Sequence, residues 1–206
     1  MKKAALHNLG CKVNAYETEA MQHLLEEAGY EIVPFTQKAD VYVINTCSVT
    51  NMADRKSRQM LHKAKKNNPD SIVVATGCYV QTSEKEVLND LSVDIVIGND
   101  RKHDLVRLLE EYSLDSVNDT VDDINDEKHD FEELFIDQTK EHTRAFIKVQ
   151  DGCNQFCSYC IIPYARGRVR SRRFENVIAE VERLAANGGE LVKKQVCPQC
   201  GKIFIP

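Results

Sequence analysis

Short apolar runs alternate with amphipathic segments along the first 112 residues, and this alternation limits the fold more than any other feature of the chain. The apolar runs predict strands at Ala4–Leu9, Glu31–Phe35, Val41–Ile44, Ile72–Ala75 and Asp94–Ile97. The segments between them predict helices from a capping-box pattern at Asn14 and Glu17 to Gly29, at about 52–67, at Ser83–Leu91 and at about 102–112. Because nearly continuous apolar strands separated by helices are typical of parallel sheets, we expect a three-layer α/β domain with helices on both faces.

Three cysteines follow three of these predicted strands at equivalent places. Cys11 comes after the first strand, Cys47 after Val41–Ile44 and Cys78 after Ile72–Ala75. The carboxyl ends of parallel strands share one edge of a sheet, where ligands bind, so we expect the three thiols to converge. Cysteine is also a common buried residue in α/β cores, but three at equivalent positions favour a metal site.

A second group of cysteines is close together in the sequence. Cys153, Cys157 and Cys160 have the spacing C-x3-C-x2-C. Thiolates this close can bind three corners of an iron–sulfur cubane, and no fourth cysteine lies nearby, so one iron would stay open. A structural zinc would need a fourth ligand, and a disulfide would leave one cysteine over. The spacing therefore predicts a three-cysteine iron–sulfur site.

The net charge of −5 conceals separate acidic and basic segments. Residues 113–143 carry eleven acidic residues against two lysines, which indicates a linker between domains. Basic residues concentrate in 55–66 and again in 164–173, where Arg166, Arg168 and Arg170 are candidate contacts to RNA phosphates. A charged run is also commonly just a solvated face of the protein.

The sequence also indicates where in the cell the protein is located. The chain shows neither a signal peptide nor an apolar run as long as a bilayer span, so we expect a cytoplasmic protein with no membrane partner. In that reducing compartment, eight cysteines indicate metal binding rather than disulfides.

Cys197 and Cys200 look like one zinc knuckle and are candidate zinc ligands, although a structural zinc needs four ligands and the partner knuckle is absent.

The segment from Cys153 to Cys160 resembles the signature of the radical S-adenosylmethionine enzymes. The resemblance implies that a [4Fe-4S] cluster binds S-adenosyl-L-methionine at its open iron, and that an electron donor drives cleavage of this ligand to a radical. It also implies that Arg144–Gln150 is the first strand of a partial (β/α) barrel. Tyr159 stands at the family position beside the adenine, and simple packing within the loop is the alternative for it. No catalytic side chain is implied beyond the cluster ligands.

The blocks around the first three cysteines are similar to the N-terminal domain of the methylthiotransferases. These blocks are Leu9–Asn14, Asn45–Thr50 and Thr76–Gln81, and the run Asn45–Arg58 resembles the branch that acts on tRNA threonylcarbamoyladenosine. The resemblance implies a second [4Fe-4S] cluster on Cys11, Cys47 and Cys78. It further implies methylthiolation of C2 of N6-threonylcarbamoyladenosine at position 37, in the tRNA anticodon loop. A non-catalytic iron–sulfur or zinc-binding fragment, or a methylthiotransferase of another substrate branch, is the alternative.

The resemblance also divides the chain. We expect a methylthiotransferase N-terminal domain at 1–112, an acidic linker at 113–143, a radical S-adenosylmethionine core at 144–190 and an atypical tail at 191–206. Within the core, one amphipathic helix is predicted at Phe174–Ala185. Because the remaining strands of the family's barrel do not follow this helix, we expect the chain to be truncated at its C-terminal end.

Overall fold

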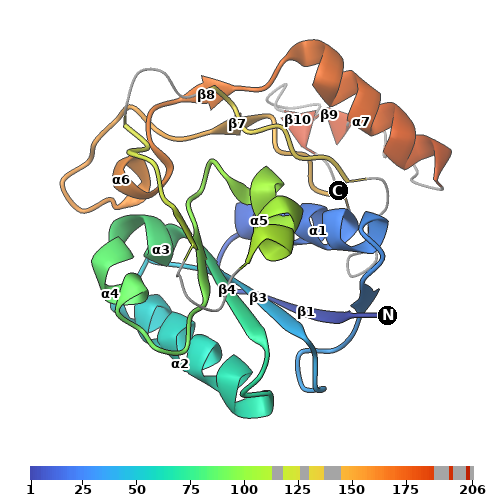
Figure 1. Cartoon of the computed structure of the whole chain (residues 1–206). Helices are drawn as coiled ribbons and strands as arrows, with labels where there is room; N and C mark the ends of the chain where they lie inside the picture. Colours follow the sequence, from blue (N-terminus) through green and yellow to red (C-terminus); the bar gives the residue numbers. More distant parts are fainter. Residues whose placement is uncertain (113–117, 126–129, 137–144, 188–194, 197–202, 205–206) are drawn as a thin grey trace.

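A parallel sheet is the centre of the fold. The structure is a computed structural model, and it describes residues 1–112, 118–125, 130–136, 145–187, 195–196 and 203–204. In these residues six strands, all parallel, form the main sheet in the order β2-β1-β3-β4-β5-β6 (Figure 1). They are β1 (Lys3–Asn8), β2 (Glu31–Ile32), β3 (Val41–Thr46), β4 (Ile72–Gly77), β5 (Ile95–Ile97) and β6 (Asn118–Thr120).

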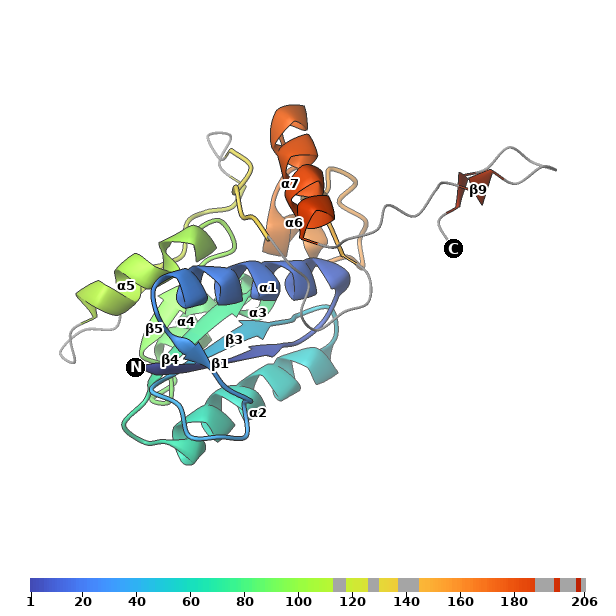
Figure 2. The same ribbon diagram turned by 90° about the vertical axis from the view of Figure 1, so that its right-hand side faces the viewer.

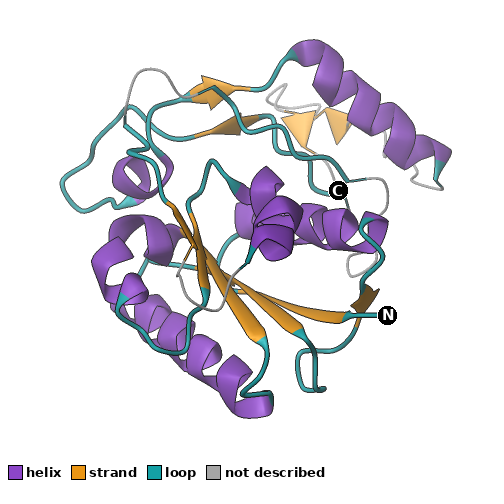
Figure 3. Cartoon of the chain, in the orientation of Figure 1, coloured by secondary structure: helices purple, strands orange, loops and turns teal. Residues whose placement is uncertain are grey.

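Helices cover both faces of this sheet, which confirms the predicted three layers (Figures 2 and 3). One face carries α1 (Lys12–Glu27), the short helix η1 (Lys102–Asp104) and α5 (Leu105–Glu111), and the other carries α2 (Asn51–Asn67), α3 (Cys78–Thr82) and α4 (Glu84–Leu88). Successive residues of β3 face opposite layers. Val41 and Val43 pack in the cluster with α1 and α5, whereas Tyr42 and Ile44 pack in the cluster with α2 and α4. Burial on both faces explains why this strand is apolar throughout.

The predicted capping box at the start of α1 is wrong. The helix begins at Lys12, with Cys11 at the N-cap position, so Asn14 and Glu17 lie inside it. Both side chains are fully buried on the side that also carries Met21 and Leu25. The Asn14 amide donates to the carbonyl oxygens of Leu9 and Thr46, at 2.8 and 2.9 Å. The helix thus uses this amide to bind the strand ends rather than to cap itself.

Two strand predictions also differ from the structure. Asp94–Ile97 was expected to be the last strand of the sheet, but β6, from the acidic segment 113–143, pairs with β5 beyond it. Of the predicted strand Arg144–Gln150, only Gln150 lies in a strand, β7 (Gln150–Asp151), which pairs antiparallel with β8 (Arg170–Ser171). Residue 144 lies outside the described residues. An apolar pattern indicates burial, but a strand also needs a neighbouring backbone to bond with, and 145–149 forms no ladder in the described part.

The second half of the chain packs on the first through two helices. Helix α6 (Ile162–Arg166) contacts α3, and α7 (Phe174–Ala186) packs on α1 through a third apolar cluster. The buried members of this cluster are Tyr16, Ala20, Leu134, Ile136 and Leu184. Beyond a gap in the described residues, β9 (Gln195–Val196) and β10 (Ile203–Phe204) form an antiparallel pair. None of the helices in the described part of the chain has the length and apolar character that a membrane span requires.

Candidate metal centre and its surroundings

The first three cysteines lie at the ends of three neighbouring strands. Cys11 follows β1, Cys47 follows β3 directly and Cys78 is the first residue of α3, directly after β4. Since β1, β3 and β4 are adjacent and parallel, their carboxyl ends share one edge of the sheet. The register pairs Asn8 with Asn45 and Thr46 with Gly77, so Cys47 and Cys78 come at matching steps. The topology brings the three cysteines to this edge, as their spacing after the strands predicts.

The three thiols differ in exposure. Cys47 and Cys78 are buried, whereas Cys11 is exposed and its sulfur lies 3.8 Å from Oδ1 of Asn14. Within the described residues, no three His, Cys, Asp or Glu side chains are grouped so that they could hold a metal ion. Burial raises the pKa of the Cys78 thiol, and the positive charges of Arg166 and Lys102 act in the opposite direction.

Two glycines let the backbone come close to these cysteines. Gly10 has φ +108°, and a Cβ added there would lie 2.7 Å from Sγ of Cys47. Gly77 has φ +98°, and a Cβ there would lie 2.4 Å from the carbonyl oxygen of Thr46. Both conformations belong to glycine, and both contacts exclude a side chain. The chain therefore packs tightly around the sulfur of Cys47.

A buried group of charged side chains lies next to Cys78 and joins the two halves of the chain. Glu17 of α1 is fully buried, and its carboxylate accepts from Lys148 at 2.7 Å and from Arg166 at 2.8 Å. Lys102, also fully buried, lies 3.4 Å from the same carboxylate. Asp151 pairs with Lys148 at 2.6 Å and with Arg166 at 3.0 Å. We call these five residues the Glu17 network.

The charges of the Glu17 network do not cancel. Three cations and two anions leave one excess positive charge in a buried place, and Arg166 and Lys102 act on Cys78. Burial alone would raise the pKa of Glu17, but Arg166, Lys102 and Lys148 hold it well below its usual range. An anionic group at the cysteine edge would balance this excess charge.

The second cysteine group forms a loop between β7 and α6. Cys153 and Cys160 are half-buried and Cys157 is exposed. The loop is closed at its base, where the Cys153 amide donates to the carbonyl oxygen of Gly167 at 3.0 Å. Gly152, at φ +77°, precedes it, and a Cβ there would lie 2.1 Å from the carbonyl oxygen of Arg168. These backbone contacts hold the three cysteines in one short loop.

Aromatic side chains surround this loop. Phe156 has φ +46°, unusual for a residue with a side chain, and its ring packs edge-on against Tyr164 at 5.8 Å. The guanidinium of Arg168 lies over the same ring at 4.5 Å. Tyr159 is 90% exposed, so it does not have the packing role that was its alternative. Its ring stays open to a ligand.

The three candidate RNA-binding arginines have different surroundings. Arg168 is exposed. Arg170 is mostly buried, pairs with Asp100 and donates to the carbonyl oxygen of Arg166 at 2.9 Å. Arg166 is 3% exposed, and its guanidinium donates hydrogen bonds to Glu17, Asp151 and Asn14. The assignment of Arg166 to an RNA contact is therefore corrected: its partner Glu17 is 149 residues away in the sequence, and the pair became visible only in the folded chain.

The two cysteine groups are on the same side of the molecule. Helix α6, which directly follows the loop of Cys153, Cys157 and Cys160, packs against α3, which starts with Cys78 (Figure 1). The Asn99 amide, after β5, donates to the carbonyl oxygen of Ala165 at 2.6 Å and strengthens this contact. Cys78, at the start of α3, and the loop that leads into α6 are therefore connected through packed helices, although Cys78 and Cys153 are 75 positions apart in the sequence.

Sequence reasoning missed most of the Glu17 network. A signal for Glu17 was present, because Asn14, Glu17 and Met21 fall at helical spacing on the stripe that the apolar residues also occupy. A charged residue on such a stripe indicates a buried ion pair. Lys102 and Lys148 gave no comparable signal. Cys197 and Cys200 lie outside the described residues.

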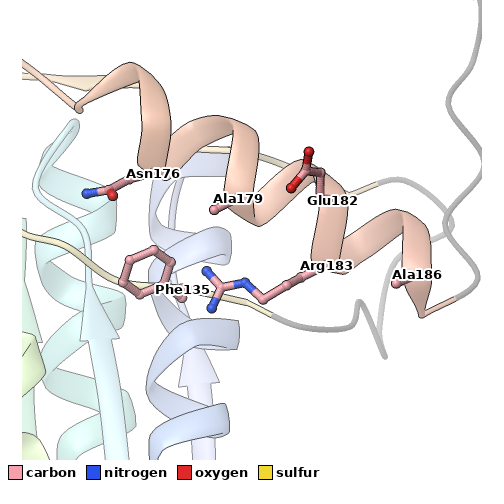
Figure 4. Close-up of a pocket in the computed structure, with 6 residues that line it drawn as sticks. All are labelled: Phe135, Asn176, Ala179, Glu182, Arg183 and Ala186. Atoms are coloured by element: carbon pink, nitrogen blue, oxygen red, sulfur yellow. The ribbon is translucent and has the colours of Figure 1, made fainter.

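A groove lies along α7. It is lined by Phe135, Asn176, Ala179, Glu182, Arg183 and Ala186 (Figure 4). The guanidinium of Arg183 lies 4.5 Å from the centre of the Phe135 ring. No cysteine lines this groove, so it is separate from the candidate metal centre.

Comparison with known proteins supports both halves of this arrangement. Residues 3–98 match the family model described as "Uncharacterized protein family UPF0004", and residues 147–193 match that of the "Radical SAM superfamily". The first match contains Cys11, Cys47 and Cys78, and the second contains Cys153, Cys157 and Cys160.

Curated relatives carry methylthiotransferase names. The chain is 45% identical to "Threonylcarbamoyladenosine tRNA methylthiotransferase MtaB" of Bacillus subtilis (strain 168), over 91% of this chain and 42% of the relative. It is 44% identical to the protein of the same name from Aquifex aeolicus (strain VF5), over 90% and 45%. It is 34% identical to "Ribosomal protein uS12 methylthiotransferase RimO" of Dictyoglomus thermophilum, over 91% and 43%. The chain thus spans less than half the length of these relatives.

A solved structure shares the fold. The radical S-adenosylmethionine methyltransferase TsrM from Kitasatospora setae matches with a TM-score of 0.54 and 15% identity, over 91% of this chain and 46% of that one. At this identity the match concerns the fold alone. The chain therefore contains one segment that matches the UPF0004 family model and one that matches the radical SAM superfamily, and along about nine-tenths of its length it is similar to proteins named methylthiotransferases.

Proposed function

We propose that the chain acts in the methylthiolation of C2 of N6-threonylcarbamoyladenosine at position 37 of tRNA. The names of its relatives from Bacillus subtilis and Aquifex aeolicus support this substrate, at 45% and 44% identity. The observation that carries the proposal is that α3 and α6 pack together, so that the two cysteine groups lie on neighbouring elements. Sulfur transfer to a carbon that is first activated by a radical needs both functions at one place.

The number and type of the cysteines in each group suit two thiolate-bound clusters, and the thiols of each group would have to move closer together to bind one. Cys153, Cys157 and Cys160 would hold a [4Fe-4S] cluster with S-adenosyl-L-methionine at its open iron, and Cys11, Cys47 and Cys78 would hold a second one. When bound, the two clusters supply radical formation and the sulfur. An electron donor is the partner that this chemistry requires.

The protein's own side chains position these groups. The Glu17 network fixes α1 against the segment that leads into the second cysteine loop, since Lys148 and Asp151 come directly before that loop. Burial of Cys47 and Cys78 keeps water from two of the three sulfurs on the sheet edge. The exposed ring of Tyr159 is available to stack on the adenine of the cofactor.

The other expectations remain proposals of the same kind. The division into 1–112, 113–143, 144–190 and 191–206 stays a prediction, supported by family matches at 3–98 and 147–193, whereas β6 and the buried Leu134 and Ile136 pack parts of 113–143 against the folded chain. A cytoplasmic location suits a tRNA-modifying protein. Zinc at Cys197 and Cys200 stays a prediction.

A chimera tests the substrate. Residues 1–187 would replace the matching segment of the Bacillus subtilis relative in a strain that lacks this relative, and tRNA nucleosides would be measured by mass spectrometry. We expect 2-methylthio-N6-threonylcarbamoyladenosine to appear with the chimera and to be lost with Cys47→Ala or Cys157→Ala. The exposed-residue variant Lys38→Gln is the control and should keep the product.

Two results would contradict the proposal. If the chimera is expressed and loaded with iron but gives no methylthio product, the chain does not have the proposed activity. A methylthio group on isopentenyladenosine, with none on threonylcarbamoyladenosine, would show that the chain acts on the substrate of another branch of the family.

A further inference from the structure

Helix α2 carries basic residues that the fold does not use. Between residues 55 and 66 the sequence has six Lys and Arg and no acidic residue. Two of the six have partners: Lys65 pairs with Asp94 at 2.7 Å, and Arg58 donates to the Tyr79 hydroxyl at 3.0 Å. The other four are exposed and make no ion pair with the described residues; they are Arg55, Lys56, Lys63 and Lys66. We call these four the α2 stripe.

The α2 stripe lies on one side of the helix. At 3.6 residues per turn, its four positions fall within an arc of about 100°, opposite Ser57, Leu61 and Ala64, which are buried. At 1.5 Å per residue the stripe is about 17 Å long. Lys63 and Lys66 are one helical turn apart. Because like charges at this spacing repel each other, the arrangement does not stabilise the helix. A stripe of this kind is suited to a polyanion rather than to the helix itself.

One end of the stripe is next to the cysteine edge. Arg55 and Lys56 precede Ser57, whose hydroxyl donates to the carbonyl oxygen of Cys47 and accepts from its amide, both at 3.2 Å. Val49 and Met52, at the start of α2, are 55% and 60% exposed. A strand of phosphates along the stripe would therefore approach the edge where Cys47 lies.

The local charge is opposite to that of the whole chain. The chain has a net charge of −5, yet the acidic residues on and near α2 face groups outside the stripe: Asp54, in the first turn of α2, acts on Arg58, Glu86 lies near Arg58, and Asp90 lies near His62. The stripe is thus a positive line on a negative protein, and electrostatic attraction would guide a polyanion to it.

We propose that the α2 stripe binds the phosphodiester backbone of the tRNA substrate, away from the nucleotide that reacts. The identity of the RNA rests on the function proposed above, whereas backbone binding rests on the stripe alone. Because phosphate contacts carry no sequence information, the stripe orients the RNA relative to the cysteine edge and does not select it. The α2 stripe would thus supply phosphate contacts of the kind that the sequence predicts for Arg166, which is buried.

Salt-dependent binding tests this proposal. Fluorescently labelled tRNA would be titrated with the full chain at several salt concentrations, and the slope of log K against log salt measured. Each phosphate neutralised on a single strand contributes about 0.7 to this slope. Lys63→Gln with Lys66→Gln should therefore lower the slope by about 1.4 and weaken binding at low salt. The matched control is Lys38→Gln with Lys85→Gln, two exposed lysines elsewhere, which should bind like the unchanged chain.

The outcomes are distinct. Unchanged affinity and slope in the α2 variant, or an equal loss in the control, would overturn the stripe as a specific surface. Displacement of tRNA by polyglutamate at equal charge would assign the stripe to an acidic polypeptide instead. Equal binding of tRNA with and without threonylcarbamoyladenosine is expected. Failure of the function would appear only as a chimera without methylthio product, with stripe binding intact.

Discussion

Gly152 shows how a single residue can control one candidate cluster site. Its φ is +77°, and a side chain there would meet the carbonyl oxygen of Arg168 at 2.1 Å. A backbone atom cannot move aside as a flexible side chain can. The residue directly precedes Cys153, so any strain at Gly152 is passed to the first ligand of the loop.

We predict that Gly152→Ala removes iron from this site alone. After anaerobic reconstitution the unchanged chain should hold about eight iron atoms and the variant about four, since each cubane has four. Gly29→Ala is the matched control: Gly29 has φ +83° but nothing within 4 Å of an added Cβ, so only the backbone conformation is penalised, by about 1–2 kcal/mol. Iron and thiol analysis would measure both. Full iron in Gly152→Ala would show that the loop tolerates the side chain.

At the scale of elements, His103 connects η1 to the segment 130–136. Its backbone amide donates to Oε1 of Glu132 at 3.0 Å, and its Nδ1 lies 3.3 Å from the same oxygen. The hydrogen bond to Glu132 raises the pKa of His103 above its ordinary value, and burial and Arg101 oppose this only in part. Burial and Lys63 lower the pKa of His7, on β1. The two imidazoles therefore shift in opposite directions.

The opposite shifts give opposite pH dependences. For His103 the folded pKa exceeds the unfolded value of about 6.5, so its stabilisation is complete below that pH and is lost as pH rises through the folded pKa. For His7 the contribution is present above about 6.5 and is lost as pH falls through the folded pKa. NMR titration of both imidazoles checks this. Glu132→Gln should return the titration midpoint of the His103 imidazole toward 6.5 and leave that of His7 unchanged. A midpoint below 6.5 for His103 in the unchanged chain would contradict the raised pKa of His103.

At the scale of the whole molecule, the Glu17 network and a second buried network hold the two halves together. In the second, the Tyr16 hydroxyl lies 2.9 Å from Glu180 of α7 and 2.6 Å from the carbonyl oxygen of Leu134. Arg172 pairs with the same Glu180. Both networks start on α1, so this one helix is the common support of the cysteine edge and of the second cysteine loop.

We predict that Glu17→Gln destabilises the whole chain by about 3–5 kcal/mol, the usual cost of removing one partner from a buried ion pair. The change leaves three cations against Asp151 alone, an excess of two positive charges. Urea unfolding measures the loss, and hydrogen exchange should rise both in α1 and in 145–166. Glu110→Gln, on the exposed side of α5, is the control and should change stability by less than about 0.5 kcal/mol. A loss below about 1 kcal/mol for Glu17→Gln would mean that the network is not what joins the halves.

The sequence by itself determined the features that depend on local pattern. Apolar strands separated by helices specified the parallel sheet and its two covered faces, because burial on both sides of a strand leaves no polar position. Once that sheet was inferred, Cys11, Cys47 and Cys78 had to meet at one edge, since strand direction alone decides it. The short spacing of Cys153, Cys157 and Cys160 needed no tertiary information at all.

Only the tertiary structure decided what the charged residues do. Asn14 and Glu17 matched a capping box by spacing, and Arg166 matched a phosphate contact by composition, yet the fold brings Arg166 to both of them across more than 140 residues. Conversely, the six basic residues of 55–66 look alike in the sequence, and the structure separates two paired ones from the four of the α2 stripe. The burial of a residue can be predicted from the apolar pattern of its neighbours in the sequence. An ion pair also needs a partner, and only the folded chain brings that partner near.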